Sequence, residues 1–334
     1  MTERGPIFVG GLERTGTSLL YALLASHPRI AMTRRTNWWT FFDGRFGDLA
    51  RDENLDRCLA VMMRYRRHRK LEPDRDRLRA ELRAGDASYC RLFGLLEAHH
   101  AERLGKPRWG DKSLLTERYA DRVLECFPDA RILHMIRDPR DRYASSLKRW
   151  KSNRGGVGSA TASWISSVAL GERNERTHPG RSMIVRYEDL AGEPEAMLHR
   201  ICAFIDEPFD VEMLQMGGAA DFREAGGNSS FGRFATGQIS TASIGRYRSA
   251  LHEQQIAFIQ RHAGRPMDRH GYAGSKVEMS GWAALRYQLR DAPLNRGMMA
   301  AWRLRELYHN LTGRTPSAHT MEEPGGHAGQ ESKS

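Results

Sequence analysis

The stretch Gly10-Gly11-Leu12-Glu13-Arg14-Thr15-Gly16-Thr17-Ser18-Leu19-Leu20 decides the fold. It follows the apolar run Ile7-Phe8-Val9 and precedes apolar residues, so it predicts a strand, a glycine-rich turn and a helix N-terminus. Backbone amides of such a turn, together with the helix dipole, bind phosphate. From Gly11 to Ser18 the spacing matches a nucleotide-binding P-loop, except that Thr17 replaces the lysine. The stretch therefore predicts an anion cradle in which Arg14 supplies the cation, and it argues against ATP.

A second segment predicts a phosphate contact at the end of another strand. Arg131–Ile136 is typical of a buried strand, and Arg137 follows it directly. A P-loop NTPase is expected to place a magnesium-binding aspartate near this point. Ser145 lies about two helical turns beyond Arg137 and can offer its hydroxyl to the same phosphate. A cation where a metal ligand is expected favours phosphate binding without Mg²⁺.

These segments resemble the sulfotransferases that use 3′-phosphoadenosine 5′-phosphosulfate (PAPS). The 5′-phosphosulfate loop of that family is similar to Arg14–Ser18, and its 3′-phosphate motif is similar to Arg137–Ser145. Further matches in family order are Trp109-Gly110-Asp111-Lys112, Val185–Leu190 and, less specifically, Ser243–Tyr247. The resemblance covers roughly residues 5–270. It implies a bacterial-type member, similar to the tyrosylprotein and heparan sulfotransferase branch, with PAPS as cosubstrate.

The resemblance also implies roles for individual residues. The expected cofactor-binding residues are Arg14, Thr15, Gly16, Thr17, Ser18, Arg137, Ser145, Tyr187 and Arg246. Lys112 matches a lysine that some members use near the leaving oxygen, and a solvated loop lysine is the alternative. Tyr187 could equally be a core aromatic. The histidines show no spacing typical of a metal site, so we predict no metal.

The general base is missing from this pattern. Related enzymes place a glutamate or histidine shortly after the first helix, and several carry a Phe-Phe-Asp motif just beyond that glutamate. This chain has Phe41-Phe42-Asp43, but no glutamate lies between Glu13 and Glu53. Asp43 and Lys112 are therefore the two catalytic candidates, and a capping role is the alternative for Asp43. The fallback bases are Asp111, His27 and His134.

Several alternatives remain open at this stage. A P-loop kinase or NTPase is one, with Asp138 as its best support; a nucleotide-binding module that has lost its base is another. Trp38, Trp39, Phe41 and Phe42 either line an acceptor pocket or belong to the core. The acceptor is expected to be a hydroxyl of a glycan, a lipid or a small metabolite.

Composition limits the class of protein. The chain has 334 residues, a net charge of +11, and only seven lysines among its 52 basic residues. This arginine excess has two explanations, a GC-rich genome or attraction of a highly charged anionic cosubstrate. The arginines are scattered without aromatic-rich strands or zinc-finger spacing, so we expect no nucleic-acid partner.

The compartment is predicted from the termini and the cysteines. No apolar run approaches the roughly 20 residues of a membrane span, and the N-terminus lacks the pattern of a signal peptide. Golgi sulfotransferases carry an N-terminal anchor, so the chain is expected to be cytoplasmic. The cysteines form no C-x-x-C pair, which predicts buried thiols in a reducing compartment. They are Cys58, Cys90, Cys126 and Cys202.

Strands that alternate with helices predict an α/β fold, a P-loop-NTPase-like central parallel sheet flanked by helices. Ligands gather at the carboxyl ends of such strands, where Arg14, Lys112 and Arg137 all fall. We expect a sulfotransferase domain over residues 1–275, a helical extension over 276–314 and a disordered tail over 315–334. The Gly/Ser/Ala-rich segment 217–245 predicts a loop. The extension is expected to pack against the domain or another subunit, with peripheral membrane contact and homo-oligomerisation left open.

Overall fold

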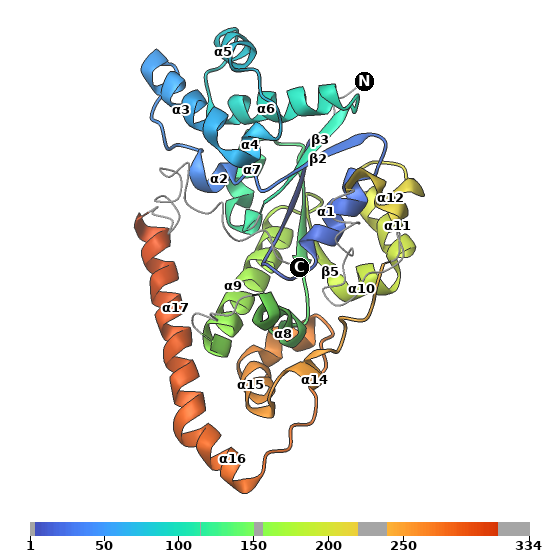
Figure 1. Ribbon diagram of the computed structural model, residues 1–334, viewed down its shortest axis with the longest axis vertical. Coiled ribbons are helices and arrows are strands. Elements are labelled where there is room, and N and C mark those ends of the chain that lie inside the picture. Colours follow the sequence, from blue (N-terminus) through green and yellow to red (C-terminus); the bar gives the residue numbers. More distant parts are fainter. Residues whose placement is uncertain (1–3, 114, 150–155, 220–238, 313–334) are drawn as a thin grey trace.

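A five-stranded parallel sheet forms the centre of the computed structural model, which describes residues 4–113, 115–149, 156–219 and 239–312 (Figure 1). Its strand order is β2-β3-β1-β4-β5, and every neighbouring pair is parallel. The strands are β1 (Ile7–Gly11), β2 (Ile30–Arg34), β3 (Arg108–Lys112), β4 (Arg131–Ile136) and β5 (Ser182–Arg186). The predicted α/β class with a parallel sheet is confirmed.

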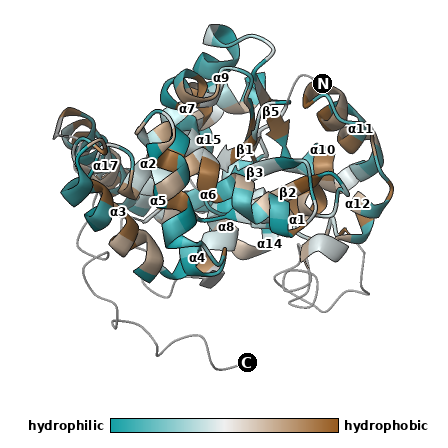
Figure 2. Cartoon of the chain, turned by 90° about the horizontal axis from the view of Figure 1, so that it is seen from above, coloured by the Kyte–Doolittle hydropathy of each residue, from teal (hydrophilic) through white to brown (hydrophobic). Residues whose placement is uncertain are grey.

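Helices cover both faces of this sheet. Those before β4 are α1 (Thr17–Ala25), α2 (Trp38–Phe41), α3 (Asp52–Arg64), α4 (Arg66–Arg69), α5 (Arg75–Arg83), α6 (Tyr89–Arg103), η1 (Thr116–Tyr119) and α7 (Ala120–Cys126). Those that follow are α8 (Pro139–Arg149), α9 (Gly156–Thr177), α10 (Tyr187–Gly192), α11 (Pro194–Phe204), α12 (Glu212–Gln215), η2 (Gly217–Ala219), α14 (Tyr247–Ala250) and α15 (Glu253–Arg269). Figure 2 shows the strands between α10–α12 on one side and α2–α6 on the other.

The alternation of side chains along β1 explains this layering. Ile7 and Val9 pack in one core cluster with α1 and α11, whereas Phe8 packs in a second cluster with α6 and α7. Successive side chains of a strand point to opposite faces, so a fully apolar strand needs cover on both. The P-loop-like turn therefore begins at the carboxyl end of the central strand, in a sheet that is buried on both faces.

Two stretches between β2 and β3 are helical. The aromatic stretch after β2 contains the short helix α2. The charged helical region forms four helices, α3–α6, and Asp74 caps α5 by accepting hydrogen bonds from the amides of Asp76 and Arg77. The helices are interrupted at Tyr65, around Pro73 and after Arg83.

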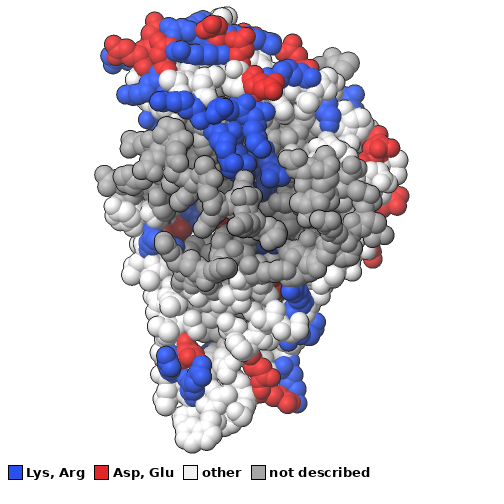
Figure 3. Space-filling model, in the orientation of Figure 1, with Lys and Arg blue, Asp and Glu red and all other residues white. Residues whose placement is uncertain are grey.

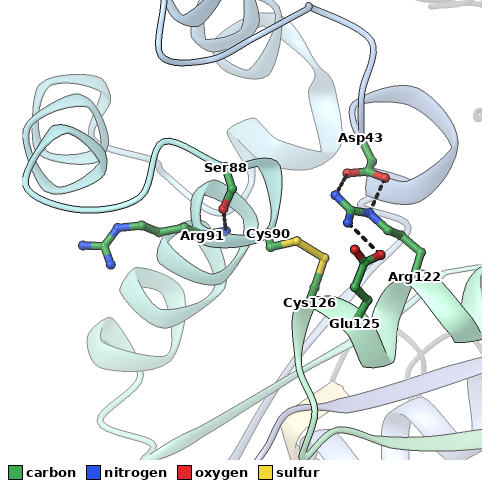
Figure 4. The surroundings of a disulfide bond; sticks show 7 residues. All are labelled: Asp43, Ser88, Cys90, Arg91, Arg122, Glu125 and Cys126. Carbon is green, nitrogen blue, oxygen red and sulfur yellow. Dashed lines mark hydrogen bonds and ion pairs between the residues drawn. A yellow bond between two sulfur atoms is a disulfide. The ribbon is translucent and has the colours of Figure 1, made fainter.

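The prediction of four buried thiols is wrong for two of the cysteines. Cys90 near the start of α6 and Cys126 at the end of α7 form a disulfide, with their Cα atoms 5.2 Å apart (Figure 4). Cys58 and Cys202 are buried free thiols. The pairing joins two helices, which spacing along the chain does not reveal. The cysteines consequently no longer support a reducing compartment.

The helical extension is confirmed over its described part. It consists of α16 (Gly281–Arg286), a π-helical turn (Tyr287–Asp291) and α17 (Ala292–Thr312). α17 packs against α9, so the expected packing on the domain is present. None of the described helices has the length and hydropathy needed to cross a membrane. The predicted tail, and residues 220–238 of the predicted loop, lie outside the described residues.

Candidate anion-binding site

The turn between β1 and α1 has the backbone geometry of an anion cradle. Gly11 and Gly16 have φ values of 124° and 97°, a region that favours glycine. A Cβ atom on Gly16 would lie 2.4 Å from Cδ2 of Tyr187, so this position admits no side chain. Gly16 precedes α1 and has no side chain that could cap it. The first amides of α1 therefore remain available to an anion at the positive end of the helix dipole.

Three contacts fix the shape of this turn. The Thr15 hydroxyl donates to the carbonyl of Leu12 at 2.7 Å, and the Gly11 amide donates to the Glu117 carboxylate at 3.1 Å. Arg142 Nε donates to the carbonyl of Glu13 at 3.2 Å. Burial lowers the pKa of Arg142 to about 10, so its charge is retained at neutral pH. Glu117 and Arg142 were not predicted, because their contacts come from elements distant in the sequence.

Arg137 connects β4 to this turn and to the segment before α14. Its guanidinium donates to the carbonyls of Arg14, at 3.3 Å, and Ser243, at 2.7 Å. It also lies 4.4 Å from the centre of the Tyr187 ring, and the Tyr187 hydroxyl is 2.7 Å from that of Ser243. Arg137 is 6% exposed, and its Nε has no hydrogen-bond partner among the described residues. The carboxylates of Asp141 and Glu188 interact with this charge at longer range, since Arg137 favours their ionised forms. A buried cation whose hydrogen bonds go to neutral carbonyls fits an anionic ligand.

The other predicted phosphate-binding residues lie around Arg137. Arg14 Nε donates to the Ser145 hydroxyl at 2.9 Å, which joins the two predicted arginine motifs directly. Burial lowers the pKa of Arg246, and repulsion from Arg137 lowers it further. Asp141 accepts hydrogen bonds from the amides of Gly245 and Tyr247 at 2.7 and 2.8 Å, which holds this segment against α8. The fold thus brings Arg14, Arg137, Ser145, Tyr187 and Arg246 together, although Asp141 and Ser243 were not singled out.

Lys112 lies at the end of β3, beside the central strand. It pairs in register with Val9 on one side and Arg34 on the other, so all three face the α1 side of the sheet. Lys112 is only 3% exposed, which rules out a solvated loop lysine. Burial lowers its pKa to about 7, and repulsion from Arg35 and Arg34 contributes. Its charge is therefore sensitive to an anion bound nearby.

A group of four arginines lies beyond Lys112 at the edge of the sheet: Arg34, Arg35, Arg66 and Arg67. Burial lowers the pKa of Arg67, and repulsion from the other three lowers it further. His68 Nε2 donates a hydrogen bond at 3.2 Å to the carbonyl of Thr36, which holds α4 against this edge. Figure 3 shows a dense group of basic side chains where α4 lies in Figure 1. We call these four residues the basic cluster.

Asp43 lies in a different environment from Lys112. Its two carboxylate oxygens accept from Arg122 Nε and Nη2 on α7, at 3.1 and 3.2 Å (Figure 4). To accept a proton, Asp43 would have to give up part of this bidentate ion pair. The neighbouring rings of Trp38, Trp39 and Phe42 are buried in the core, which decides between the two roles left open for them. Phe41 is partly buried against the same cluster.

The fallback bases are all held by internal contacts. Asp111 is fully buried and accepts from the Thr33 hydroxyl at 3.1 Å; burial raises its pKa. His27 Nε2 lies 2.9 Å from the carbonyl of Pro208. His134 is buried within β4, where burial lowers its pKa. Of the three, Asp111 alone is adjacent in sequence to Lys112.

Asp138, the best support for a kinase or NTPase, is engaged by a neighbouring arginine. Its carboxylate accepts from Arg140 Nη2 at 2.6 Å and from Arg140 Nε at 3.0 Å. Arg140 also stacks over Tyr247, at 4.2 Å from the ring centre. Asp138 therefore has a structural role in holding α14 and α8 together, and its geometry does not favour a nucleotide-bound metal.

Comparisons with known proteins agree with this geometry. A model of the sulfotransferase family matches residues 6–211, and the chain therefore belongs to this family. It is 26% identical over 223 residues to a protein-tyrosine sulfotransferase of Drosophila melanogaster, covering 62% of this chain and 39% of the relative. It is 27% identical over 216 residues to protein-tyrosine sulfotransferase A of Caenorhabditis elegans, covering 62% and 51%. The chain thus spans about half the length, or less, of these relatives.

A solved structure supports the fold independently. The sulfotransferase domain of the olefin synthase of Synechococcus PCC 7002 superposes with a TM-score of 0.51 at 21% identity, over 79% of this chain and 97% of that domain. The region that aligns includes more than the P-loop-like turn, since it spans most of both chains. The fold class predicted from the alternating strands and helices is therefore shared with a known sulfotransferase domain.

Proposed function

We propose that this chain transfers a sulfuryl group from PAPS to an acceptor hydroxyl. The observation that carries the proposal is the contact between the two arginine motifs, in which Arg14 binds Ser145 and Arg137 binds the carbonyl of Arg14. This contact supports the proposal that both phosphates of the nucleotide bind around one turn at the carboxyl ends of the strands. PAPS would supply the activated sulfuryl group. The acceptor is a hydroxyl of a glycan, a lipid or a small metabolite.

Each residue of the site then has a defined task. The amides at the start of α1, with Arg14, bind the 5′-phosphosulfate, and Arg137, Ser145 and Arg246 bind the 3′-phosphate. Tyr187 supports Arg137 through its ring, whose centre lies 4.4 Å from the guanidinium carbon. The acceptor oxygen forms a bond to sulfur while the bond from sulfur to the phosphate oxygen breaks. Lys112 stabilises the negative charge that develops on this leaving oxygen, as preorganised cations do in other active sites.

Asp43 remains the proposed base. It would take the acceptor proton, and Arg122 would orient it and then stabilise the recovered carboxylate. The cost of partly losing Arg122 is the main argument against this role. Asp111, next to Lys112, is the second candidate, because its Oδ2 is buried without a hydrogen-bond partner among the described residues.

Binding tests the cosubstrate. Adenosine 3′,5′-bisphosphate, the product left by PAPS, should bind in calorimetry equally well with Mg²⁺ and with EDTA, because arginines rather than a metal hold its phosphates. ATP should bind at least about 10-fold more weakly, since the loop lacks its lysine. Tight ATP binding that requires Mg²⁺ would favour the kinase or NTPase instead.

Transfer tests the activity. The protein is incubated with PAPS labelled in the sulfuryl group and a fractionated cell extract, and sulfated products are identified by mass spectrometry. The Arg137→Ala variant serves as the control for background transfer. Binding of the bisphosphate without any labelled product would identify a nucleotide-binding module that has lost its base.

A further inference from the structure

The C-terminal arm, residues 281–311, exposes large apolar side chains in two groups, one on α16 and the π-helical turn and the other on the C-terminal half of α17, which together we call the stripe. Figure 1 shows α17 along the outside of the molecule with α16 at its tip, and in Figure 2 α17 is again outermost. Trp282, Leu289 and Leu311 are 84%, 73% and 77% exposed. The stripe consists of Trp282, Leu285, Leu289, Leu304, Leu307 and Leu311. Monomeric soluble proteins seldom expose so many large apolar groups on one arm.

The opposite face of the arm is fixed to the domain. Met299 is buried and Trp302 partly buried in the core cluster that includes α9. The backbones of Gly158 and Asn295 approach so closely that a Cβ on Gly158 would lie 2.1 Å from the Asn295 carbonyl oxygen. Glu306 forms an ion pair with Arg118. The stripe therefore faces outward because the other side of the helix is already packed.

Arginines border the stripe on both sides. Successive residues of a helix turn by about 100°. Arg303 consequently borders the row of Leu304, Leu307 and Leu311 on one side, and Arg296 precedes the row on that side by two turns. Arg305 lies on the other side of the row, about 100° around the helix from Leu304. The arm contains five arginines against two acids, Asp291 and Glu306. Asp291 pairs with Arg286 of the arm, whereas Glu306 pairs with Arg118 outside it, so neither of these ion pairs involves Arg296, Arg303 or Arg305.

We propose that this arm binds the surface of an anionic lipid bilayer. An amphipathic helix with tryptophan and leucine on one face and arginine along its borders inserts its apolar face at the boundary between head groups and acyl chains. The arginines then contact anionic head groups. A second copy of the chain would also cover the apolar stripe, but Arg303 and Arg305 beside the stripe would repel the same arginines of that copy. The positive charge of the arm is therefore complementary to an anionic bilayer and not to a second copy of the chain.

Vesicle sedimentation of the full chain tests the proposal. The protein should sediment with vesicles of phosphatidylcholine containing 30% phosphatidylglycerol, and several-fold less with phosphatidylcholine alone or in high salt. The variant Trp282→Ser with Leu289→Ser removes apolar contacts without changing charge, and should lose at least about 10-fold in partitioning. The matched control, Leu104→Ser with Val211→Ser, removes two exposed apolar residues elsewhere and should bind as the wild type does.

Two results would overturn the proposal. One is equal binding to both kinds of vesicle, or equal binding by the two double variants. The other has two parts: the wild type does not bind vesicles, and light scattering shows a dimer that the Trp282→Ser, Leu289→Ser variant does not form. This result would identify a second copy of the chain as the partner. Both positions are exposed, so the variants should fold, and circular dichroism verifies this. The outcome does not depend on the sulfotransferase activity.

Discussion

Arg137 contributes a buried positive charge whose hydrogen bonds go to the carbonyls of Arg14 and Ser243. Lys112 contributes a second buried cation, which lies at the end of the neighbouring strand β3. Asp43 differs from both, because its charge is already matched by Arg122. At the scale of single residues, the site therefore contains two buried cations that can bind an anionic ligand. It also contains one carboxylate, which must give up part of its ion pair with Arg122 before it can accept a proton.

Substituting Arg137 should weaken binding of the 3′-phosphate specifically. Arg137→Ala removes a charge-assisted contact of about 1.5–3 kcal/mol, so affinity for adenosine 3′,5′-bisphosphate should fall on the order of 10- to 100-fold. Affinity for adenosine 5′-phosphate should change much less. Calorimetry with both nucleotides measures the difference, and Arg248→Ala, an exposed arginine near the same segment, is the control. Equal losses for the two nucleotides would show that Arg137 has another role.

Lys112 should make nucleotide binding depend on pH. Its pKa is lowered to about 7, so the free protein loses this charge as the pH rises above 7. A bound anion favours the charged form, so binding at pH 8 should take up a proton and affinity should fall between pH 7 and pH 9. Calorimetry in two buffers with different ionisation enthalpies counts the proton. In Lys112→Met this uptake should disappear; an unchanged uptake would assign it to another group.

If Asp43 is the base, Asp43→Asn should leave nucleotide affinity nearly unchanged and reduce turnover by about 10²–10⁴-fold. An acceptor phenol that is already ionised at the assay pH needs no base, so it should restore turnover in Asp43→Asn but not in Lys112→Met. Initial rates with phenols of graded acidity measure this. Near-normal turnover of Asp43→Asn with a weakly acidic alcohol would move the search to Asp111.

The disulfide acts at the scale of elements, because it joins the start of α6 to the end of α7. α7 also carries Arg122, which holds Asp43 at the end of α2. The disulfide and this ion pair therefore fix the same helix to the aromatic core from two directions (Figure 4). The turn between β1 and α1 is held by other contacts, from Glu117 in η1 and Arg142 in α8.

Breaking the disulfide should lower stability more than it lowers nucleotide binding. It closes a loop of 36 residues, which corresponds to about 3–4 kcal/mol in the chain-entropy account. The variant Cys90→Ser with Cys126→Ser should therefore lose on the order of 5–10 °C in melting temperature. Reductant should produce a similar loss in the wild type and none in the variant. Alkylation of the unfolded, unreduced protein should modify two cysteines, and modification of all four would contradict the disulfide.

At the scale of the whole molecule, charge is distributed unevenly. The net charge is +11, and the basic cluster of Arg34, Arg35, Arg66 and Arg67 concentrates part of it beside Lys112. Figure 3 shows acidic side chains interspersed with basic ones on the more distant helices, in contrast to this group. A concentrated positive field beside a binding site speeds the arrival of an anion.

Reversing part of this field should slow association. Arg66→Glu with Arg67→Glu should reduce the association rate of adenosine 3′,5′-bisphosphate about 10-fold at low salt and flatten its salt dependence. Arg261→Glu with Arg265→Glu makes the same change in net charge on α15 and should have a smaller effect. Stopped-flow measurements at several ionic strengths compare the two. Equal effects would show that net charge matters and that the basic cluster does not.

The sequence by itself determined the parallel sheet, the anion cradle and the residues at its strand ends. These features depend on short-range patterns. Gly16 provides the positive φ at the end of the turn, and the apolar run from Ile7 predicts the buried strand that precedes the turn. Arg137 and Lys112 were predictable for the same reason, because Lys112 is the last residue of a strand and Arg137 directly follows one. The sequence predicted both of these strands and placed these residues at their carboxyl ends. The two-sided burial of the sheet followed from the absence of polar alternation in β1.

Only the tertiary structure decided which distant groups meet. The partners of Arg137 and Asp43 are separated from them by 106 and 79 residues, and the two bridged cysteines by 36. No local periodicity encodes such pairs, because they depend on how helices from separate parts of the chain pack on the sheet. For the same physical reason the aromatic stretch at Trp38 was ambiguous from sequence, and the packing of α6 and α7 made it core.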